Sequence, residues 1–366
     1  MKKGMAGFIT VLVCTILILS FNIGTAAETG KLDKQITFNM HHGIPVGHYL
    51  DKAHQLWISK VEKKSEGKIK IKLYPSAQLY TDVSAVQALK TGALECAWDY
   101  DHKFFTVVPS ISALGLPSCA IAGNTDPDTR KSLFAMYDAF QKGEGPGALL
   151  DQDFQKAGMK VNHFVHWTPT TGYMSKAKPW IKPADLKGKK IRVNNVGDAK
   201  MYAGAGAQPV SLSGAELYIA AQRGTIDGHL GYYNHLMERK EYEVFDWFVA
   251  PLPAQVCIGV VAFNLKWYNS LPEAAKKIMQ EAGFEVDREV RPQLEILDRQ
   301  YHEELVKLKP SFKFHTLTAA EQQAWADLYL PASRKNAIDA GPSAVKMYNA
   351  CQDLKRKVGI KADSNI

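Results

Sequence analysis

The feature that most constrains this fold is an alternation of strand-like and helix-like segments near the N-terminus. The segment 69–74, I-K-I-K-L-Y, alternates apolar and charged residues, which is typical of a half-buried strand. Segments 36–40 and 94–98 are also strand-like, and between these strands apolar residues recur at helical spacing. A strand, helix, strand, helix, strand order is typical of parallel construction with crossover connections. We therefore predict an α/β fold.

The same pattern restarts later in the chain, which predicts a second α/β lobe. Strand-like segments lie at 159–165 and 190–193, and the apolar stretch 255–264 is expected to carry the chain back to the first lobe. A mature chain of about 340 residues also exceeds the usual size of one hydrophobic core. The cleft between two such lobes is the default ligand site. The expected lobes are residues 28–150, joined by about 250–272, and residues 151–249.

The C-terminal third is expected to be helical. S-L-P-E at 270–273 and T-A-A-E at 318–321 are capping-box patterns, which mark helix starts. The first of these helices is expected to be unusually long and to run toward Leu308.

The N-terminus has the three-part pattern of a secretory signal. Lys2 and Lys3 precede the mostly apolar run 8–21. The small residues G-T-A-A at 24–27 follow before the first acidic residue. We expect residues 1–27 to be a cleaved signal peptide and the mature protein to be periplasmic. An uncleaved anchor is the alternative, but a bilayer span takes about 20 apolar residues and this run is shorter.

The net charge of +8 is spread along the chain, with no long lysine or arginine stripe. Nucleic-acid binding requires a concentrated basic face, so we expect no nucleic-acid partner and a mild attraction toward anionic ligands. Four cysteines remain after the leader, and none forms a C-x-x-C or zinc-like pattern. Disulfides and free buried thiols both stay open for them. They are Cys96, Cys119, Cys257 and Cys351.

Several segments in register carry a family resemblance. K-P-A-D-L-K-G-K-K-I-R-V at 182–193 resembles the P-x-D-L-K-G-x-K-I-R-V motif of periplasmic solute-binding proteins of tripartite ATP-independent periplasmic (TRAP) transporters. A-Q-P-V-S-L-S-G-A-E-L-Y at 207–218 and A-A-Q-R-G-T-I-D-G at 220–228 are similar to the signatures that follow. Y-P-S-A-Q-L at 74–79 and A-L-K-T-G-A-L-E at 88–95 are similar to first-lobe segments of the family. The resemblance covers nearly all of the mature chain.

The resemblance implies a two-lobe periplasmic-binding-protein fold with a hinge, a central cleft and a long helix that spans both lobes. The helices of 273–366 would then pack on both lobes. It also implies a monomeric protein that captures a small organic acid and delivers it to integral membrane TRAP subunits, with no catalytic residue and no cofactor. A periplasmic ligand sensor is one alternative. A periplasmic enzyme acting on a small carboxylate is another, although the chain has no G-x-S-x-G elbow and no glycine-rich phosphate loop.

Arg192 is the central candidate for ligand binding. It aligns with the family arginine that holds a substrate carboxylate, and a guanidinium matches a carboxylate with two parallel hydrogen bonds. The alternative is an ordinary ion pair with a neighbouring acid at a strand end. Asn194 could contact the ligand or cap a turn. Glu216 matches a family glutamate near the cleft, and it could orient Arg192 or serve only at a helix start.

Departures from the family pattern bear on the ligand. Thr171 stands near where many relatives have a second arginine, and H-L-G-Y at 229–232 replaces the family's Gln-Glu-Asn-Pro. The aromatic residues gained would suit an acid with an aromatic or apolar body, although several could be ordinary core residues. Asp99 or Asp101 could instead receive an ammonium group. The candidate aromatic residues are Trp98, Tyr100, Trp167, Tyr173, Tyr232 and Tyr233.

Four histidines near the N-terminus raise the question of a metal. No acid or cysteine completes a recognisable ligand pattern around them, so we expect no metal site. A calcium or sodium ion that bridges ligand and protein stays open. We expect cleft-lining or loop-stabilising roles and include His41 among the ligand candidates. The four are His41, His42, His48 and His54.

Overall fold

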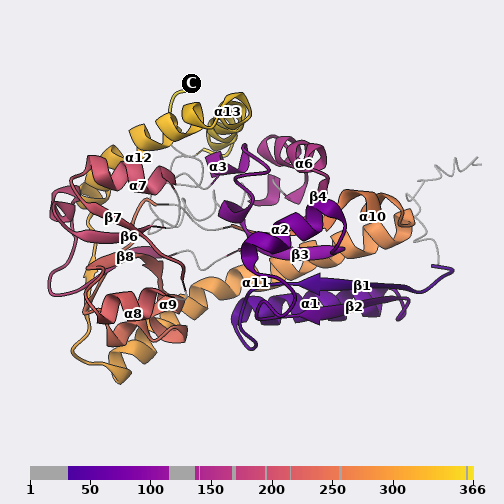
Figure 1. Cartoon of the computed structure of the whole chain (residues 1–366), viewed down its shortest axis with the longest axis horizontal. Helices are drawn as coiled ribbons and strands as arrows, with labels where there is room; N and C mark the ends of the chain where they lie inside the picture. The colour runs from indigo at the N-terminus through magenta and orange to yellow at the C-terminus, as the bar shows by residue number, and fades with distance from the viewer. Residues whose placement is uncertain are drawn as a thin grey trace, which may run out of the picture. The chain divides into compact units, whose positions relative to one another are not determined.

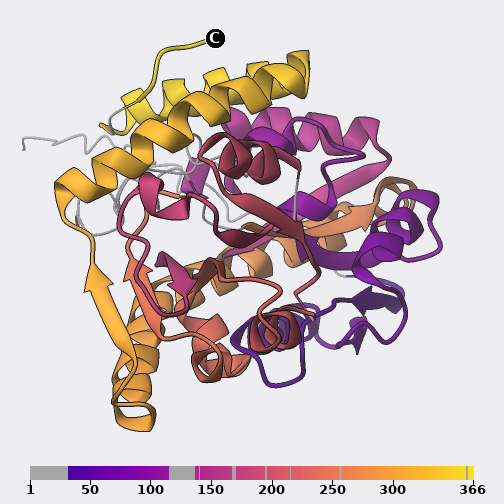
Figure 2. The same cartoon turned by 60° about the vertical axis from the view of Figure 1, so that its left-hand side comes forward.

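The computed structural model describes one compact unit that begins at Leu32 and contains two β-sheets (Figure 1, Figure 2). The expected leader at 1–27 lies outside the described residues, as do Cys119, Cys257, Trp167 and Asn194. The described residues are 32–114, 137–139, 141–166, 170–193, 196–214, 216–254, 258–359 and 362–366.

The first sheet has the strand order β2-β1-β3-β10-β4. β1 is parallel to β2 and β3, whereas β10 is antiparallel to β3 and β4. Every residue of β10 is buried: Val260 and Ala262 enter one core, and Val261 and Phe263 enter the other. The predicted apolar strand is confirmed, because a central strand covered on both faces has no polar side. The strands are β1 (Ile36–His41), β2 (Ile69–Tyr74), β3 (Cys96–Tyr100), β4 (Met159–His166) and β10 (Ile258–Asn264).

Helices cover both faces of this sheet, and we call the sheet with these helices the first lobe. α1 buries Leu50 and Trp57 in the core on one face, and α2 and α6 bury Leu89 and Phe154 in the core on the other. α2 ends at Gly92, whose left-handed backbone is the usual helix stop. The helices are α1 (Tyr49–Lys64), α2 (Asp82–Thr91), η1 (Asp101–Lys103), α3 (Ile111–Leu114), α6 (Pro146–Lys156) and α10 (Leu265–Asn269).

The second sheet, with the order β11-β9-β5-β8-β6-β7, organises the second lobe. β6 is parallel to both β7 and β8, so the carboxyl ends of these three strands share one edge. In parallel sheets this edge is where ligands bind. The strands are β5 (Thr171–Ser175), β6 (Lys190–Val193), β7 (Gln208–Ser211), β8 (Gly228–Tyr232), β9 (Trp247–Ala250) and β11 (Lys313–Thr316). The helices are η2 (Pro183–Leu186), α7 (Val196–Gly204), α8 (Leu217–Gln222), α9 (Tyr233–Glu238) and η3 (Glu241–Glu243).

Strand β4 differs from the sequence-based division of the chain. Residues 159–166 lie in the range expected for the second lobe, yet β4 pairs with β10 in the first sheet. The hydrophobic pattern identifies a strand, but it carries no information about which sheet that strand joins. By strand pairing, the boundary between the lobes therefore lies after β4 and not at residue 151.

The 36-residue helix α11 (Glu273–Leu308) spans both lobes, as the resemblance implies. It contacts α1 and β4 in the first lobe and α9 in the second (Figure 1). Met279 lies in a core of the first lobe, and Leu305 lies in a core of the second. Gly283 permits the close approach to β4, because a Cβ at this position would lie 2.5 Å from the ring of His163.

The two predicted helix starts have different outcomes. Thr318 and Glu321 form the predicted capping box at the start of α12 (Ala319–Asp339), which is followed by α13 (Pro342–Lys357). The box predicted at 270–273 is wrong: α11 begins after Pro272 without a side-chain cap, because Ser270 ends the short helix α10. α12 contacts α3 of the first lobe and α7 of the second.

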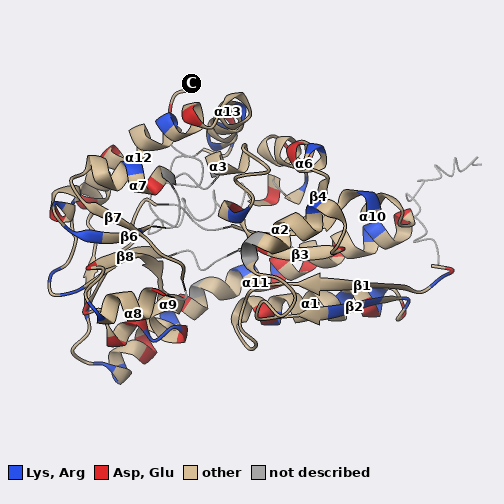
Figure 3. Cartoon of the chain, in the orientation of Figure 1, with Lys and Arg blue, Asp and Glu red and all other residues tan. Residues whose placement is uncertain are grey.

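The charged residues and the cysteines are placed as in an ordinary folded protein. Basic and acidic residues are interspersed over the elements of both lobes (Figure 3). Cys351 is buried. Cys96 is a buried free thiol, and burial raises its pKa well above the ordinary value. A thiol in that state is inert. Within the described ranges, the structure contains no helix of the length and apolarity that a membrane span requires.

Candidate ligand-binding site

Arg192 lies on β6, at the sheet edge formed by parallel strand ends. Its Nε–H donates to the carbonyl oxygen of Leu212 at 3.1 Å. Burial, followed by repulsion from Arg239, lowers the pKa of Arg192 to about 10, so the guanidinium stays charged at neutral pH. Among the residues that the structure describes, no carboxylate lies within ion-pair distance of it. The positive charge of Arg192 is therefore available to an anion.

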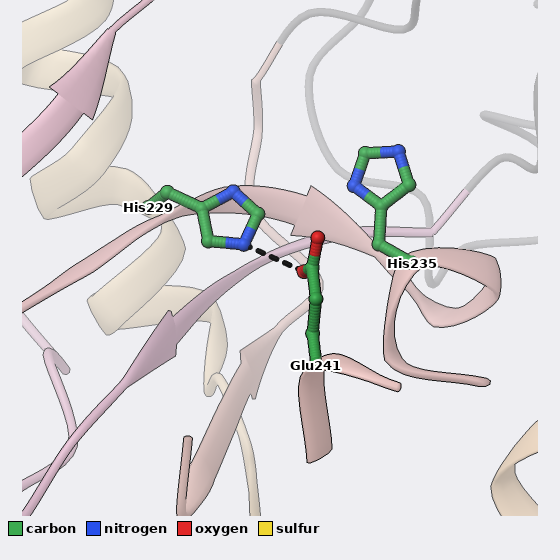
Figure 4. A group of neighbouring side chains, drawn as sticks. All are labelled: His229, His235 and Glu241. Atoms are coloured by element: carbon green, nitrogen blue, oxygen red, sulfur yellow. Dashed lines mark hydrogen bonds and ion pairs between the residues drawn. The ribbon is translucent and has the colours of Figure 1, made fainter. Parts of the chain in front are cut away.

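A buried ion pair lies beside Arg192, because β6 and β8 place His229 opposite it in register. Nδ1 of His229 lies 2.8 Å from the carbonyl oxygen of Leu230, and Nε2 lies 2.8 Å from Glu241 (Figure 4). Burial opposes the negative charge of Glu241, but His229, Arg239 and Arg192 outweigh it and hold the pKa of Glu241 below its ordinary value. A carbonyl oxygen only accepts, so the Nδ1–H of His229 donates to Leu230, and one proton is shared between Nε2 and Glu241. The pair is neutral as a unit.

His235, on α9, completes a cluster with this pair (Figure 4). One potential ligand atom from each of His229, His235 and Glu241 lies within 4.8 Å of the others. These three side chains are of types that can hold a metal ion. The surroundings oppose a cation. Burial, followed by Arg239, His229 and Arg192, holds the pKa of His235 well below its ordinary value. Since both nitrogens of His229 are engaged and two arginines lie close, the local charge favours an anion beside the cluster.

The segment H-L-G-Y at 229–232 supplies His229 and the space around it. Gly231 leaves the space that the two imidazoles occupy: a Cβ there would lie 2.9 Å from Cε1 of His229 and 3.2 Å from Nδ1 of His235. Any side chain at residue 231 would displace one of the rings.

Three of the predicted aromatic residues come together where the lobes meet. Tyr232 ends β8 of the second sheet, yet it packs into a core of the first lobe together with Trp98 and Tyr100. The rings of Trp98 and Tyr100 have centroids 4.9 Å apart, and Tyr232 meets His235 edge-on at 5.2 Å. Tyr100 is close enough to Arg192 to favour its charged form. These residues stay candidates for the apolar wall of the site.

Two predicted aromatic residues lie elsewhere. Tyr173 is fully buried in a core of the second lobe, and its hydroxyl group bonds those of Tyr202 at 3.0 Å and Tyr329 at 2.6 Å. Its neighbour Met174, not Tyr173, is in register with His229. Since neighbouring residues of a strand face opposite sides, Tyr173 lies on the face opposite His229. Tyr233 packs on Phe248, at a centroid distance of 4.6 Å.

The remaining predicted residues have local roles or lie outside the described ranges. Glu216 accepts hydrogen bonds from the backbone N–H and hydroxyl of Ser213, at 3.0 and 2.7 Å, and is fully solvated. This geometry matches the helix-start alternative. Asp99 accepts the backbone N–H of Tyr100, and Asp101 accepts that of His102. Trp167 and Asn194 lie outside the described residues.

The N-terminal histidines mostly serve the first lobe. His41, at the end of β1, is buried and meets the ring of Tyr80 edge-on at 5.9 Å. Nε2 of His42 lies 3.2 Å from the buried carboxylate of Asp51, and the rings of His42 and His54 are 4.9 Å apart. The expected loop-stabilising role fits His42. The position of His41 at a strand end keeps it as a ligand candidate.

His48 connects the two lobes. Its Nδ1 accepts the backbone N–H of Leu50 at 3.1 Å and so caps α1. Because Nδ1 is an acceptor, the ring proton is on Nε2, which lies 2.6 Å from the carboxylate of Glu238 on α9. Tyr301 of α11 donates to the other oxygen of Glu238 at 2.6 Å. One imidazole therefore caps a first-lobe helix and binds a second-lobe carboxylate.

Three residues of the candidate site were not predicted from the sequence: His235, Arg239 and Glu241. A signal was present, since His229, His235 and Glu241 have the regular spacing H-x5-H-x5-E. That spacing matches no common metal motif, and only the fold brings the segment next to Arg192.

A separate surface hollow of about 510 Å³ lies between η2 and the start of α12. It includes none of the residues around Arg192, so its size does not make it the candidate site. Its lining is Lys178, Pro179, Ile181, Lys182, Asp185, Ala320, Glu321 and Ala324.

The known proteins that this chain resembles in sequence are of one kind. The C4-dicarboxylate-binding periplasmic protein DctP of Vibrio cholerae is 26% identical over 347 residues, which cover 92% of this chain and 96% of that protein. The sialic acid-binding periplasmic protein SiaP of the same species is 27% identical over 231 residues, covering 63% of this chain and 68% of that protein. Both relatives are named as periplasmic binding proteins.

Solved structures share the fold. A TRAP periplasmic solute-binding protein from Desulfovibrio salexigens, with bound orotic acid, superimposes with a TM-score of 0.76 at 21% identity over 88% of this chain and all of that one. One from Sulfurospirillum deleyianum, with bound succinate, gives 0.70 at 22% identity over 89% of this chain and 99% of that one. The model of the family "Bacterial extracellular solute-binding protein, family 7" (DctP) matches residues 40–338. The chain therefore belongs to family 7 of the bacterial extracellular solute-binding proteins, the family of the periplasmic binding proteins of TRAP transporters.

Proposed function

We propose that this protein captures a small organic acid outside the cytoplasmic membrane and passes it to the membrane subunits of a TRAP transporter. The observation that carries the proposal is the charged Arg192 guanidinium at the end of β6, without a carboxylate partner among the described residues. A guanidinium in that state is suited to hold a carboxylate in two charge-assisted hydrogen bonds. Tyr100 and Tyr232 lie on the side of the first lobe and would contact the body of the acid.

The relatives support the chemical class. Their names specify C4-dicarboxylates and sialic acid, and the similar structures hold orotic acid, succinate and D-glucuronate. All of these compounds carry a carboxylate, whereas their bodies differ widely. The shared group is therefore the one we assign to Arg192, and we assign contacts with the ligand body to other residues of the site. We further propose that residues 1–27 direct export and are then removed.

The first experiment is mass spectrometry of the small molecules released from the exported, purified protein. We expect a carboxylic acid to be recovered, and we expect its addition to raise the melting temperature, because a ligand that binds only the native state stabilises it. The intact mass of the same sample reports whether residues 1–27 have been removed. Recovery of only non-acidic compounds, or consumption of the acid on incubation, would contradict the proposal.

The contact between His48 and Glu238 leads to a prediction about ligand release. If the lobes separate to release the acid, His48→Asn should raise its dissociation rate about two- to fivefold, because a single partly exposed hydrogen bond contributes modestly. Asparagine keeps the α1 cap but does not reach Glu238. Stopped-flow tryptophan fluorescence with the recovered acid measures the rate. Tyr301→Phe, which leaves the His48 contact intact, is the control. An unchanged rate in His48→Asn would show that this contact does not hold the lobes together.

A further inference from the structure

A second guanidinium, that of Arg239, borders the same loop as Arg192. Arg192 donates to the carbonyl of Leu212, and a Cβ at Gly214 would lie 3.3 Å from Nη1 of Arg239. Arg239 ends α9, where its backbone N–H donates to the carbonyl of His235 at 3.2 Å. The two arginines thus come from different elements and converge on the short loop 212–214.

The two positive charges are not balanced by the acid nearest to both. Glu241 is the partner of His229 at 2.8 Å, and that pair is neutral as a unit. In the described part of the chain, neither Arg192 nor Arg239 has a carboxylate within ion-pair distance. Two partly buried cations that repel each other are costly unless an anion joins them. Two negative charges on one ligand would balance them.

Thr171, which the resemblance places near a second cation position, does not supply that cation. Thr171 is fully buried, and its hydroxyl group donates to the carbonyl of Leu252 at 3.2 Å. Arg239 instead follows α9, the helix after β8, and its guanidinium borders loop 212–214 at Gly214. A second acidic group on the ligand would therefore be bound on the side of loop 212–214, close to the first.

We propose that Arg239 is a second ligand-binding cation, paired with Arg192 across loop 212–214, and that the protein selects acids with two anionic groups over otherwise similar acids with one. This inference rests on the proposed function, since it assumes that Arg192 holds a carboxylate. It extends the proposed function by specifying that the ligand carries two anionic groups and that Arg239 binds the second one.

The test uses matched pairs of acids with one and two carboxylates: propionate and malonate, butyrate and succinate, valerate and glutarate. Isothermal titration should show that wild-type protein binds the two-carboxylate member more tightly in at least one pair. Arg239→Gln should weaken binding of that member roughly 10- to 100-fold, because a charged hydrogen-bond partner is lost, and change its one-carboxylate counterpart by less than about threefold. Lys240→Gln, which removes the same charge from the adjacent exposed residue, should leave both affinities unchanged.

Three outcomes overturn the inference. One is a wild-type protein that prefers the one-carboxylate member or binds neither member of any pair. The second is an Arg239→Gln variant that keeps the preference for two carboxylates. The third is an equal loss in Lys240→Gln, which would indicate only a long-range effect of net charge. The proposed function fails separately, if no acid is recovered from the purified protein and Arg192 substitution affects no binding.

Discussion

Replacement of Arg192 by alanine is expected to weaken binding of the recovered acid by about 30- to 5000-fold. Loss of one partner from a desolvated, hydrogen-bonded charge pair costs about 2–5 kcal/mol, and much of this is the penalty for the charge left unpaired. In this variant the unpaired charge is the ligand carboxylate, which would lie beside a neutral His229–Glu241 pair. Isothermal titration at constant pH and salt measures the change.

Two controls separate the role of the guanidinium from a general loss of charge. Arg192→Lys keeps the charge but not the planar fork of donors, so its affinity should lie between those of wild type and alanine. Arg223→Ala removes an exposed arginine from the same lobe and should bind normally. Near-normal binding by Arg192→Ala would overturn the assignment of the carboxylate-binding residue. A folded circular dichroism spectrum is required of each variant.

The second large effect concerns stability in acid, and its origin is His42. Burial lowers the pKa of His42 from 6.5 to about 4, although Asp51 partly opposes the shift and His41 adds to it. Nδ1 of His42 accepts the backbone N–H of Ile44 at 3.2 Å, which also requires a neutral ring with its proton toward Asp51. The nearby ring of His54 is likewise buried, and burial holds its pKa well below the ordinary value.

The sign of the pH dependence follows from linkage. Between pH 6.5 and pH 4 the unfolded chain binds a proton at residue 42 and the folded chain does not, so the free energy of unfolding falls as the pH is lowered through this window. His42 alone accounts for a loss of about 3 kcal/mol. Urea unfolding at pH 7 and pH 4 should show this loss, and His42→Gln should reduce it.

Comparison between variants isolates this residue from the carboxylates that also titrate near pH 4. A His42→Gln variant with the same loss of stability as wild type between pH 7 and pH 4 would show that His42 is not the main group.

Much of the fold could be predicted because its signals are local. The alternation in β2, the two-sided apolar run of β10 and the long periodic pattern of α11 each reflect which faces of one element are buried. The T-A-A-E box at 318–321 was reliable because both of its hydrogen bonds lie within four residues. The box at 270–273 failed because a preceding short helix already uses Ser270 as its end.

The candidate site was predictable only in part. Arg192 could be named as a candidate because it lies in a motif that resembles a family motif in its spacing, and its role stays a prediction. Tyr173 could not be excluded from the sequence, because a side chain's face depends on the register of β5 against β8 and not on residue type. His235, Arg239 and Glu241 carried no recognisable motif.

The sequence by itself therefore determined the α/β class and the long helix α11, and it supplied Arg192 as the candidate to hold a carboxylate. Only the tertiary structure decided that β4 joins the first sheet, that Tyr232 reaches the core of the first lobe, and that Arg239 and the His229–Glu241 pair lie beside Arg192. The physical reason is the sequence separation of the residues that interact. Helix and strand periodicity is set by neighbouring residues, whereas strand pairing and charge clusters depend on which distant segments pack together, and no local pattern encodes that choice.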